Sequence, residues 1–215
     1  MTIQAILFDC DGTLVDSEVL GNRVLVEYVA EFGLELRLED VLERFVGRKM
    51  SDCVSEIEAH LGYALPEHFV PEFRRRMAQA FESELEPVTG AHEMLESLTI
   101  PFCIASSGPR EKMAVSLRKT GLDAFFPQEL IFSAYDIGTW KPDPGLFLHA
   151  AQQMGVAPEQ CLVVEDSVHG VTAGAAAGMC VVAFSLQEER ARLHGADHCI
   201  QALSELLSLL VKLSI

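Results

Sequence analysis

The stretch FDCDGTLVDSE (residues 8–18) continues the apolar run Ile3–Phe8, and together they predict a buried strand that ends at two aspartates. Side chains two residues apart in a strand point the same way, so Asp9 and Asp11 share one side. Gly12 then favours a turn, because glycine adopts conformations that other residues resist. Crowded carboxylates repel each other unless a cation lies near them, and Mg²⁺ prefers carboxylate oxygens. The stretch predicts a site for a hard metal ion, with a solvated Asp-Gly turn as the open alternative.

Five further β-rich runs follow along the chain, and helix-like segments separate them. Strands that are apolar throughout and alternate with helices indicate a parallel sheet that is covered on both faces. The predicted fold class is therefore α/β, with a doubly wound, Rossmann-like parallel sheet. The runs expected to form strands are 101–106, 130–134, 161–166, 179–184 and 197–200, and the helices expected between and after them are 109–121, 143–155, 167–177 and 202–213.

Residues 17–86 break this alternation, because they show helical patterns and no convincing strand. A helical insert therefore separates the first strand from its partners. We predict a core domain made of residues 1–16 and 87–215, and an inserted helical cap domain of residues 17–86. The helices expected in the cap are 17–32, 39–46, 50–61 and 67–83.

The composition is that of an ordinary globular protein of 215 residues, with 49% hydrophobic and 22% charged residues. A formal net charge of −16 argues against nucleic acid or an anionic membrane as a partner. No apolar run approaches the roughly 20 residues that span a bilayer, and the start MTIQAILFDCDG lacks the basic lead-in of a signal peptide. The six scattered cysteines form no CxxC pair. We expect a cytoplasmic protein, and a monomer.

Polar side chains stand at the carboxyl ends of several predicted strands. Ser106 ends the run 101–106, and Glu165 and Asp166 end the run 161–166. Ligands of open parallel sheets bind at this edge, near the point where the strand order reverses. Taken singly, Ser106 is typical of a helix cap, Lys141 in WKPDP of a surface lysine, and Glu165-Asp166 of a charged helix entry. Their joint placement with the opening aspartates predicts a site.

In this order the four patches closely resemble the motifs of the haloacid dehalogenase superfamily, in its subfamily with a helical cap after the first motif. The resemblance spans the whole chain. It implies that Asp9 attacks phosphorus and forms an aspartyl-phosphate, while Asp11 acts first as general acid and then as general base. The residues implied to bind the phosphoryl group are Ser106, Ser107, Gly108 and Lys141, and those implied to hold Mg²⁺ are Asp9, Asp11 through its carbonyl, Glu165 and Asp166.

The resemblance also implies a Mg²⁺-dependent phosphatase that acts on a small phosphorylated metabolite. The phrases FDCDGTLVDSE, FESELE (81–86) and WKPDP (140–144) resemble family members that act on a sugar phosphate or a sugar-acid phosphate such as 6-phosphogluconate. Arg48 and Lys49 lie in a predicted turn of the cap, FVGRKMSD. We expect these cations to face the end of the substrate remote from phosphate, where they could pair with a carboxylate.

Other functions remain as alternatives. Asp11 argues against the metal-free dehalogenases, which typically lack a second aspartate. The phosphoglucomutase branch typically carries a histidine ten residues beyond that aspartate, and this chain has Gly21 there, so a phosphosugar mutase is the second choice. A non-enzymatic phospho-acceptor of the receiver type is the third, disfavoured by the cap and by the acid/base residue beside the nucleophile.

Overall fold

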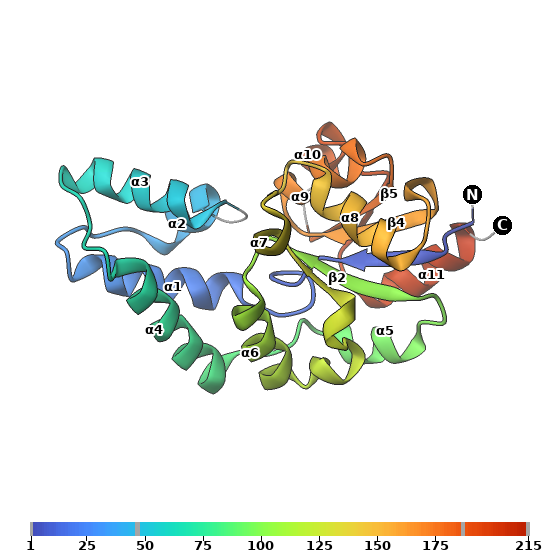
Figure 1. The fold of residues 1–215 in the computed structure, drawn as a ribbon, viewed down its shortest axis with the longest axis horizontal. Coiled ribbons are helices and arrows are strands. Elements are labelled where there is room, and N and C mark those ends of the chain that lie inside the picture. The colour runs from blue at the N-terminus through green and yellow to red at the C-terminus, as the bar shows by residue number, and fades with distance from the viewer. Residues whose placement is uncertain (1, 46–47, 186–187, 214–215) are drawn as a thin grey trace.

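A computed structural model describes residues 2–45, 48–185 and 188–213. Within them a six-stranded parallel sheet forms the core, with the order β3-β2-β1-β4-β5-β6 (Figure 1). This sheet confirms the predicted fold class. The strands are β1 (Ala5–Phe8), β2 (Phe102–Ser106), β3 (Ile131–Ser133), β4 (Cys161–Glu165), β5 (Cys180–Phe184) and β6 (His198–Ile200).

Helices cover both faces of the sheet, because successive side chains of a buried strand point to opposite faces. Ile6 and Phe8 of β1 belong to one buried cluster, and Ala5 and Leu7 of the same strand belong to another. The helices on the first face are α5 (Ala91–Ser97), α6 (Arg110–Thr120) and α11 (Ser204–Leu213), and those around the second are α7 (Ala134–Ile137), α8 (Gly145–Met154), α9 (Val168–Ala176) and α10 (Glu188–Leu193).

A group of helices lies beside the sheet (Figure 1). Two adjacent segments of the polypeptide connect this group of helices to the core. The Asp16 N–H donates to the Glu86 carbonyl at 3.0 Å, and the Val88 N–H donates to the Leu14 carbonyl at 2.9 Å. These bonds tie the two connections together where the insert begins and ends. The boundaries of the cap at 17–86 stay a prediction. Its helices are α1 (Glu18–Ala30), α2 (Leu38–Phe45), α3 (Met50–Leu61) and α4 (Phe69–Glu84).

Each predicted strand lies within one or two residues of an observed one, because a buried parallel strand is apolar throughout and is easy to recognise. The short helices α5, α7 and α10 were not predicted. They have seven, four and six residues, which is too short for a 3.6-residue repeat to show in the sequence. No helix in the described part of the chain is both long and apolar enough to cross a membrane.

The fold depends on close packing of α9 against the sheet, and Gly174 tests it. A Cβ added there would lie 2.9 Å from Val181 Cγ2 and 3.3 Å from Val163 Cγ1. We expect Gly174→Ala to lower the free energy of unfolding by about 1–3 kcal/mol, measured by urea denaturation, because overpacking outweighs the gain in helix propensity.

The matched control is Gly21→Ala in α1, where the nearest atom, Met77 Sδ, would lie 3.7 Å from the new Cβ. That variant should be as stable as the parent, or more stable by up to about 1 kcal/mol. Val181→Ala should relieve the Gly174→Ala variant in a double-mutant cycle. A coupling free energy of zero would show that Gly174 is not required for this packing.

Candidate active site

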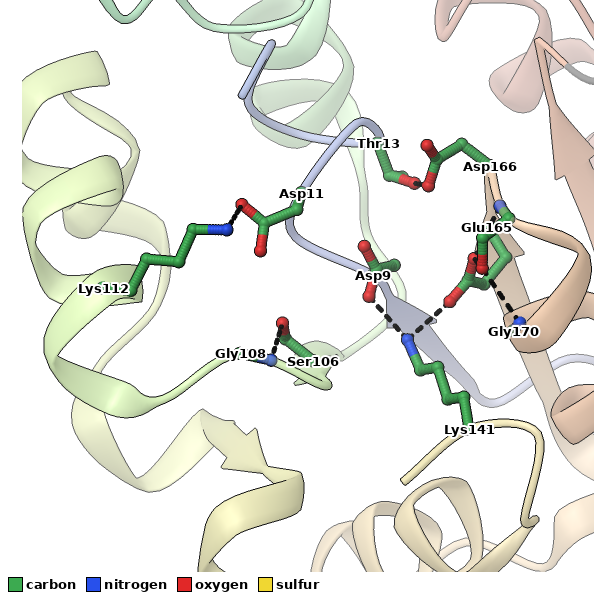
Figure 2. A network of polar contacts seen from close by, with 11 residues as sticks. Asp9, Asp11, Thr13, Ser106, Gly108, Lys112, Lys141, Glu165, Asp166 and Gly170 are labelled. Carbon is green, nitrogen blue, oxygen red and sulfur yellow. Dashed lines mark hydrogen bonds and ion pairs between the residues drawn. The ribbon is translucent and has the colours of Figure 1, made fainter. Parts of the chain in front are cut away.

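The site lies at the carboxyl ends of β1 and β4, where the strand order reverses. Lys141 lies at its centre, with only 7% of its surface exposed. Its Nζ donates to Asp9 Oδ1 and to Glu165 Oε1, each at 2.5 Å (Figure 2). Burial alone would lower the pKa of Lys141, but the two carboxylates raise it above its usual value. The lysine is therefore held as an ammonium between the two strands.

Glu165, the last residue of β4, is fully engaged by its neighbours. Its second oxygen, Oε2, accepts hydrogen bonds at 2.9 Å from the N–H and from the hydroxyl of Ser167. Gly170 makes room for it, since a Cβ there would lie 1.8 Å from the Glu165 carboxyl carbon. We expected Glu165 among the metal ligands. Both of its oxygens are already bonded, which favours a role in holding Lys141 over direct contact with a metal.

Asp11 follows Asp9 closely in sequence, but its carboxylate is directed toward α6 (Figure 2). It accepts a hydrogen bond from Ser17 Oγ at 2.6 Å and forms an ion pair with Lys112 Nζ at 2.8 Å. Burial would raise the pKa of Asp11, but the Lys112 ammonium and these hydrogen bonds lower it below its ordinary value. The two aspartates of the motif therefore have different electrostatic surroundings.

Asp166 lies against the turn that follows Asp11. Thr13 Oγ1 donates to its Oδ1 at 3.1 Å. Gly12 has φ +80°, and a Cβ there would lie 2.0 Å from Asp166 Oδ2. Glycine at this position therefore allows the backbone conformation of the turn and also leaves room for the Asp166 carboxylate.

The acidic oxygens offer a partial set of metal ligands. Among the residues that the structure describes, no three His, Cys, Asp or Glu side chains converge on one point as a metal cluster. Burial and the nearby carboxylates raise the pKa of Asp9 to about 8 and that of Asp166 well above its usual value. A cation beside these two groups would relieve that cost, and their oxygens are the donors that Mg²⁺ prefers. The donor set of Asp9, Asp166 and the Asp11 carbonyl fits Mg²⁺.

The loop after β2 offers hydrogen-bond donors beside these carboxylates. The Gly108 N–H donates to Ser106 Oγ at 3.0 Å, and Ser106 is 1% exposed. The buried hydroxyl of Ser107 has no hydrogen-bond partner within the described part of the chain. Since α6 begins at Arg110, its N-terminal amides lie next to this loop. A phosphoryl group bound here would supply the acceptor that Ser107 lacks.

The cap and the core together line a cavity of about 460 Å³ at the site. Lys141, Asp9 and Ser106 line its polar part, and its other walls carry apolar side chains that come mainly from the cap. These are Leu25, Phe45, Met50, Phe73, Met77, Phe81 and, from the core, Val115 and Trp140. The core thus supplies charge, while the cap supplies a wall that excludes water.

The two cations predicted in the cap both line this cavity, in different surroundings. Arg48 Nη1 lies 2.6 Å from Glu56 Oε2, and the same carboxylate also pairs with Arg44, so Glu56 compensates the charge of Arg48 in part. Lys49 Nζ lies over the Trp140 ring, 4.4 Å from the centroid, and has no acidic partner among the side chains that the structure describes. Val46 and Gly47 of the predicted turn lie outside the described residues.

Several residues of the site gave no clear signal in the sequence. The sequence patterns did not single out Lys112 or Ser17 as site residues. Glu18, which follows in α1, also lines the cavity, and burial with the nearby Asp11 and Glu165 carboxylates raises its pKa to about 7. The position of Lys112, one turn into the helix after a phosphoryl-binding loop, was the available hint.

The family model for haloacid dehalogenase-like hydrolases matches residues 6–184. The chain belongs to this family. The 6-phosphogluconate phosphatase of Escherichia coli (strain K12) is 44% identical over 186 residues, which cover 85% of this chain and 82% of that protein. Hexitol phosphatase A of the same organism is 30% identical over 211 residues, covering 96% and 94% of the two chains.

Solved structures agree with this assignment. A haloacid dehalogenase family hydrolase from Deinococcus radiodurans R1, with phosphate and sodium bound, is 30% identical and has a TM-score of 0.80. The alignment covers 98% of this chain and 96% of the other. The resemblance read from the four motifs is confirmed, and with it the enzyme class, phosphatase.

The role of Glu165 can be separated from metal binding by titrating Mg²⁺. Glu165→Gln should raise the KM for a phosphomonoester, because Lys141 is held less firmly, and should leave the half-activating Mg²⁺ concentration within about twofold of the parent's value. Asp166→Asn is the matched variant, and should raise that concentration about tenfold or more, since a ligand is lost. Excess EDTA should abolish activity in all of them. An equal rise in the Mg²⁺ requirement of both variants would restore Glu165 to the metal shell.

Proposed function

We propose that this phosphatase is Mg²⁺-dependent and hydrolyses a small phosphorylated metabolite, a sugar phosphate or sugar-acid phosphate such as 6-phosphogluconate, through an aspartyl-phosphate. The observation that supports it most is the buried carboxylate of Asp9, held by Lys141 at the end of β1, where it lines the cavity between core and cap. A carboxylate fixed in this way is a nucleophile that needs little reorganisation before it reacts.

The residues divide the reaction between them. The Asp9 oxygen attacks phosphorus in line, and the bond to the leaving oxygen breaks. Lys141 and the Ser106–Gly108 loop hold the phosphoryl oxygens as negative charge spreads over them. Asp11 is a carboxylate in the empty site and takes up a proton from solvent when the anionic substrate binds beside it. It gives this proton to the leaving oxygen, and then takes one from the water that hydrolyses the aspartyl-phosphate. Asp11 thus ends the two chemical steps in the protonation state in which it began them.

Asp9, Asp166 and the Asp11 carbonyl would hold the metal ion. Bound Mg²⁺ would neutralise part of the repulsion between the phosphate dianion and the carboxylates. The chain has a net charge of −16, so local cations are needed to attract an anionic substrate. Lys141, Lys112 and Lys49 line the cavity and supply them.

The substrate class is proposed from the relatives and from the cap. The relative with 44% identity is named for 6-phosphogluconate, and another for hexitol phosphates. A sugar acid carries a carboxylate at the end remote from phosphate. Lys49 is the better placed of the two predicted cap cations to meet it, since Arg48 already pairs with Glu56.

A phosphosugar mutase remains the second candidate. The position that carries the histidine in that branch is Gly21, which faces Met77 and Phe81 across the cap. A histidine there would meet these apolar side chains, which disfavours proton transfer from this position. A non-enzymatic phospho-acceptor is disfavoured further, because the family assignment makes the chain a hydrolase.

The nucleophile is tested by Asp9→Asn. We expect this variant to release no inorganic phosphate from sugar phosphates while it unfolds at nearly the parent's urea concentration, because an amide is a poor nucleophile. The exposed Asp16→Asn variant is the matched control and should keep full activity. In Asp11→Asn, mass spectrometry should find any trapped phosphoryl group on Asp9. Normal turnover by Asp9→Asn would remove Asp9 from this role.

The cap prediction compares its two cations. Lys49→Ala should raise the KM for phosphorylated sugar acids more than for neutral phosphomonoesters, and the lost discrimination should be on the order of 1–3 kcal/mol, as for a charge-assisted hydrogen bond. Arg48→Ala should have the smaller effect, because an ion pair with Glu56 already holds Arg48. Equal effects on both substrate types would show that the substrate carboxylate is bound elsewhere.

A further inference from the structure

Lys112 is a half-buried cation to which the proposed reaction gives no task beyond its positive charge. It lies in the first turn of α6, and its Nζ is 2.8 Å from Asp11 Oδ1. The two side chains are 21% and 14% exposed, and both line the cavity. In the part of the chain that the structure describes, this is the one ion pair that Asp11 makes. A largely desolvated pair of this kind is a stronger restraint than a surface ion pair.

The pair is packed against the phosphoryl-binding loop. A Cβ added to Gly108 would lie 3.4 Å from Asp11 Oδ2 and 3.7 Å from Lys112 Cδ. The Lys112 stem and the Asp11 carboxylate therefore border the same space beside Gly108. The Lys112 ammonium also lies over the Phe81 ring of cap helix α4, 5.6 Å from its centroid. It touches the acid/base residue, the loop and the cap together.

Asp11 needs such a restraint because it lies on an irregular turn between β1 and α1. Its carboxylate lies beside the loop, apart from that of Asp9 (Figure 2). In an in-line displacement the leaving oxygen lies beyond phosphorus as seen from the nucleophile, so the proton donor must be placed away from Asp9. Ser17 Oγ holds one Asp11 oxygen at 2.6 Å, and Lys112 is the charged partner of the same carboxylate.

We propose that Lys112 is a positioning residue for proton transfer: its ion pair, together with Ser17, keeps the Asp11 carboxylate at the leaving-group side of the phosphoryl-binding loop. This inference rests on the proposed function, in which Asp11 is the general acid. It gives the first turn of α6 a second task besides presenting its amides to phosphate.

The test uses the leaving group, because only a poor one needs the proton. The value of kcat/KM reports on the steps up to the first irreversible one, which here is phosphoryl transfer. It is measured for an aryl monoester, p-nitrophenyl phosphate, and an alkyl monoester, glycerol 3-phosphate. In Lys112→Met we expect kcat/KM to fall about tenfold or more for the alkyl ester and less than about threefold for the aryl ester, since general acid catalysis contributes a factor of about 10²–10⁴.

Matched variants separate positioning from general damage. Lys112→Arg keeps the charge and should restore most of the alkyl activity. Ser17→Ala removes the other restraint and should show the same bias against the alkyl ester, which keeps the proposal testable if Lys112→Met folds poorly. Lys119→Met changes an exposed lysine of the same helix and should alter neither substrate.

Equal losses on the two esters in Lys112→Met, or no loss on either, would overturn the inference. The same holds if Lys112→Arg loses as much alkyl activity as Lys112→Met. Failure of the proposed function is distinguishable, because the parent protein itself would then release no phosphate from either ester.

Discussion

A lysine ammonium between two buried carboxylates organises this molecule. Lys141 lies between Asp9 at the end of β1 and Glu165 at the end of β4, at 2.5 Å from each. Burial penalises an unpaired charge heavily, and the ammonium offsets part of that cost for both carboxylates. Removing one partner of such a buried pair typically costs about 3–5 kcal/mol. The contact that prepares the nucleophile therefore also joins the segment before α8 to the two central strands.

Glycine makes this concentration of charge geometrically feasible. Gly12 and Gly170 each lie where a side chain would collide with a carboxylate, that of Asp166 and that of Glu165 respectively. The two positions flank the same acidic pair from opposite sides. Both positions require a residue without a side chain, and Gly12 also requires a positive φ. The acidic residues can thus approach the backbone closely, and their charge is set by neighbours rather than by water.

The cap and the core contribute different kinds of side chain to one cavity. The core brings its polar groups together on rigid strand ends and one helix N-terminus, which suits a reaction that depends on fixed charges. The cap contributes apolar walls and a few cations, held over the core by contacts with aromatic rings. Lys49 lies over Trp140, and Arg74 Nη2 donates to the Tyr135 hydroxyl at 3.1 Å. Trp140 and Tyr135 themselves pack edge to face, so both cap contacts converge on the segment that carries Lys141.

The sequence by itself determined the sheet and the positions of its polar strand ends. Buried parallel strands are apolar throughout, and Asp9, Ser106 and Asp166 lie at their carboxyl ends, so local patterns were sufficient to predict the fold and the edge of the sheet at which these polar groups gather. The division into core and cap followed from the same patterns, since residues 17–86 show only the helical period. The short helices α5, α7 and α10 were missed because one or two turns do not establish a period.

Only the tertiary structure decided which partner each side chain takes. Asp9 and Asp11 share one motif, yet one pairs with Lys141 and the other with Lys112, over 100 residues away along the chain in each case. Glu165 is bonded through both oxygens, and Arg48 pairs with Glu56 across a turn of the cap. These choices depend on side-chain rotamers and on distances between elements remote in sequence. A local pattern fixes the face on which a residue lies, but the packing of neighbouring elements fixes what that residue meets.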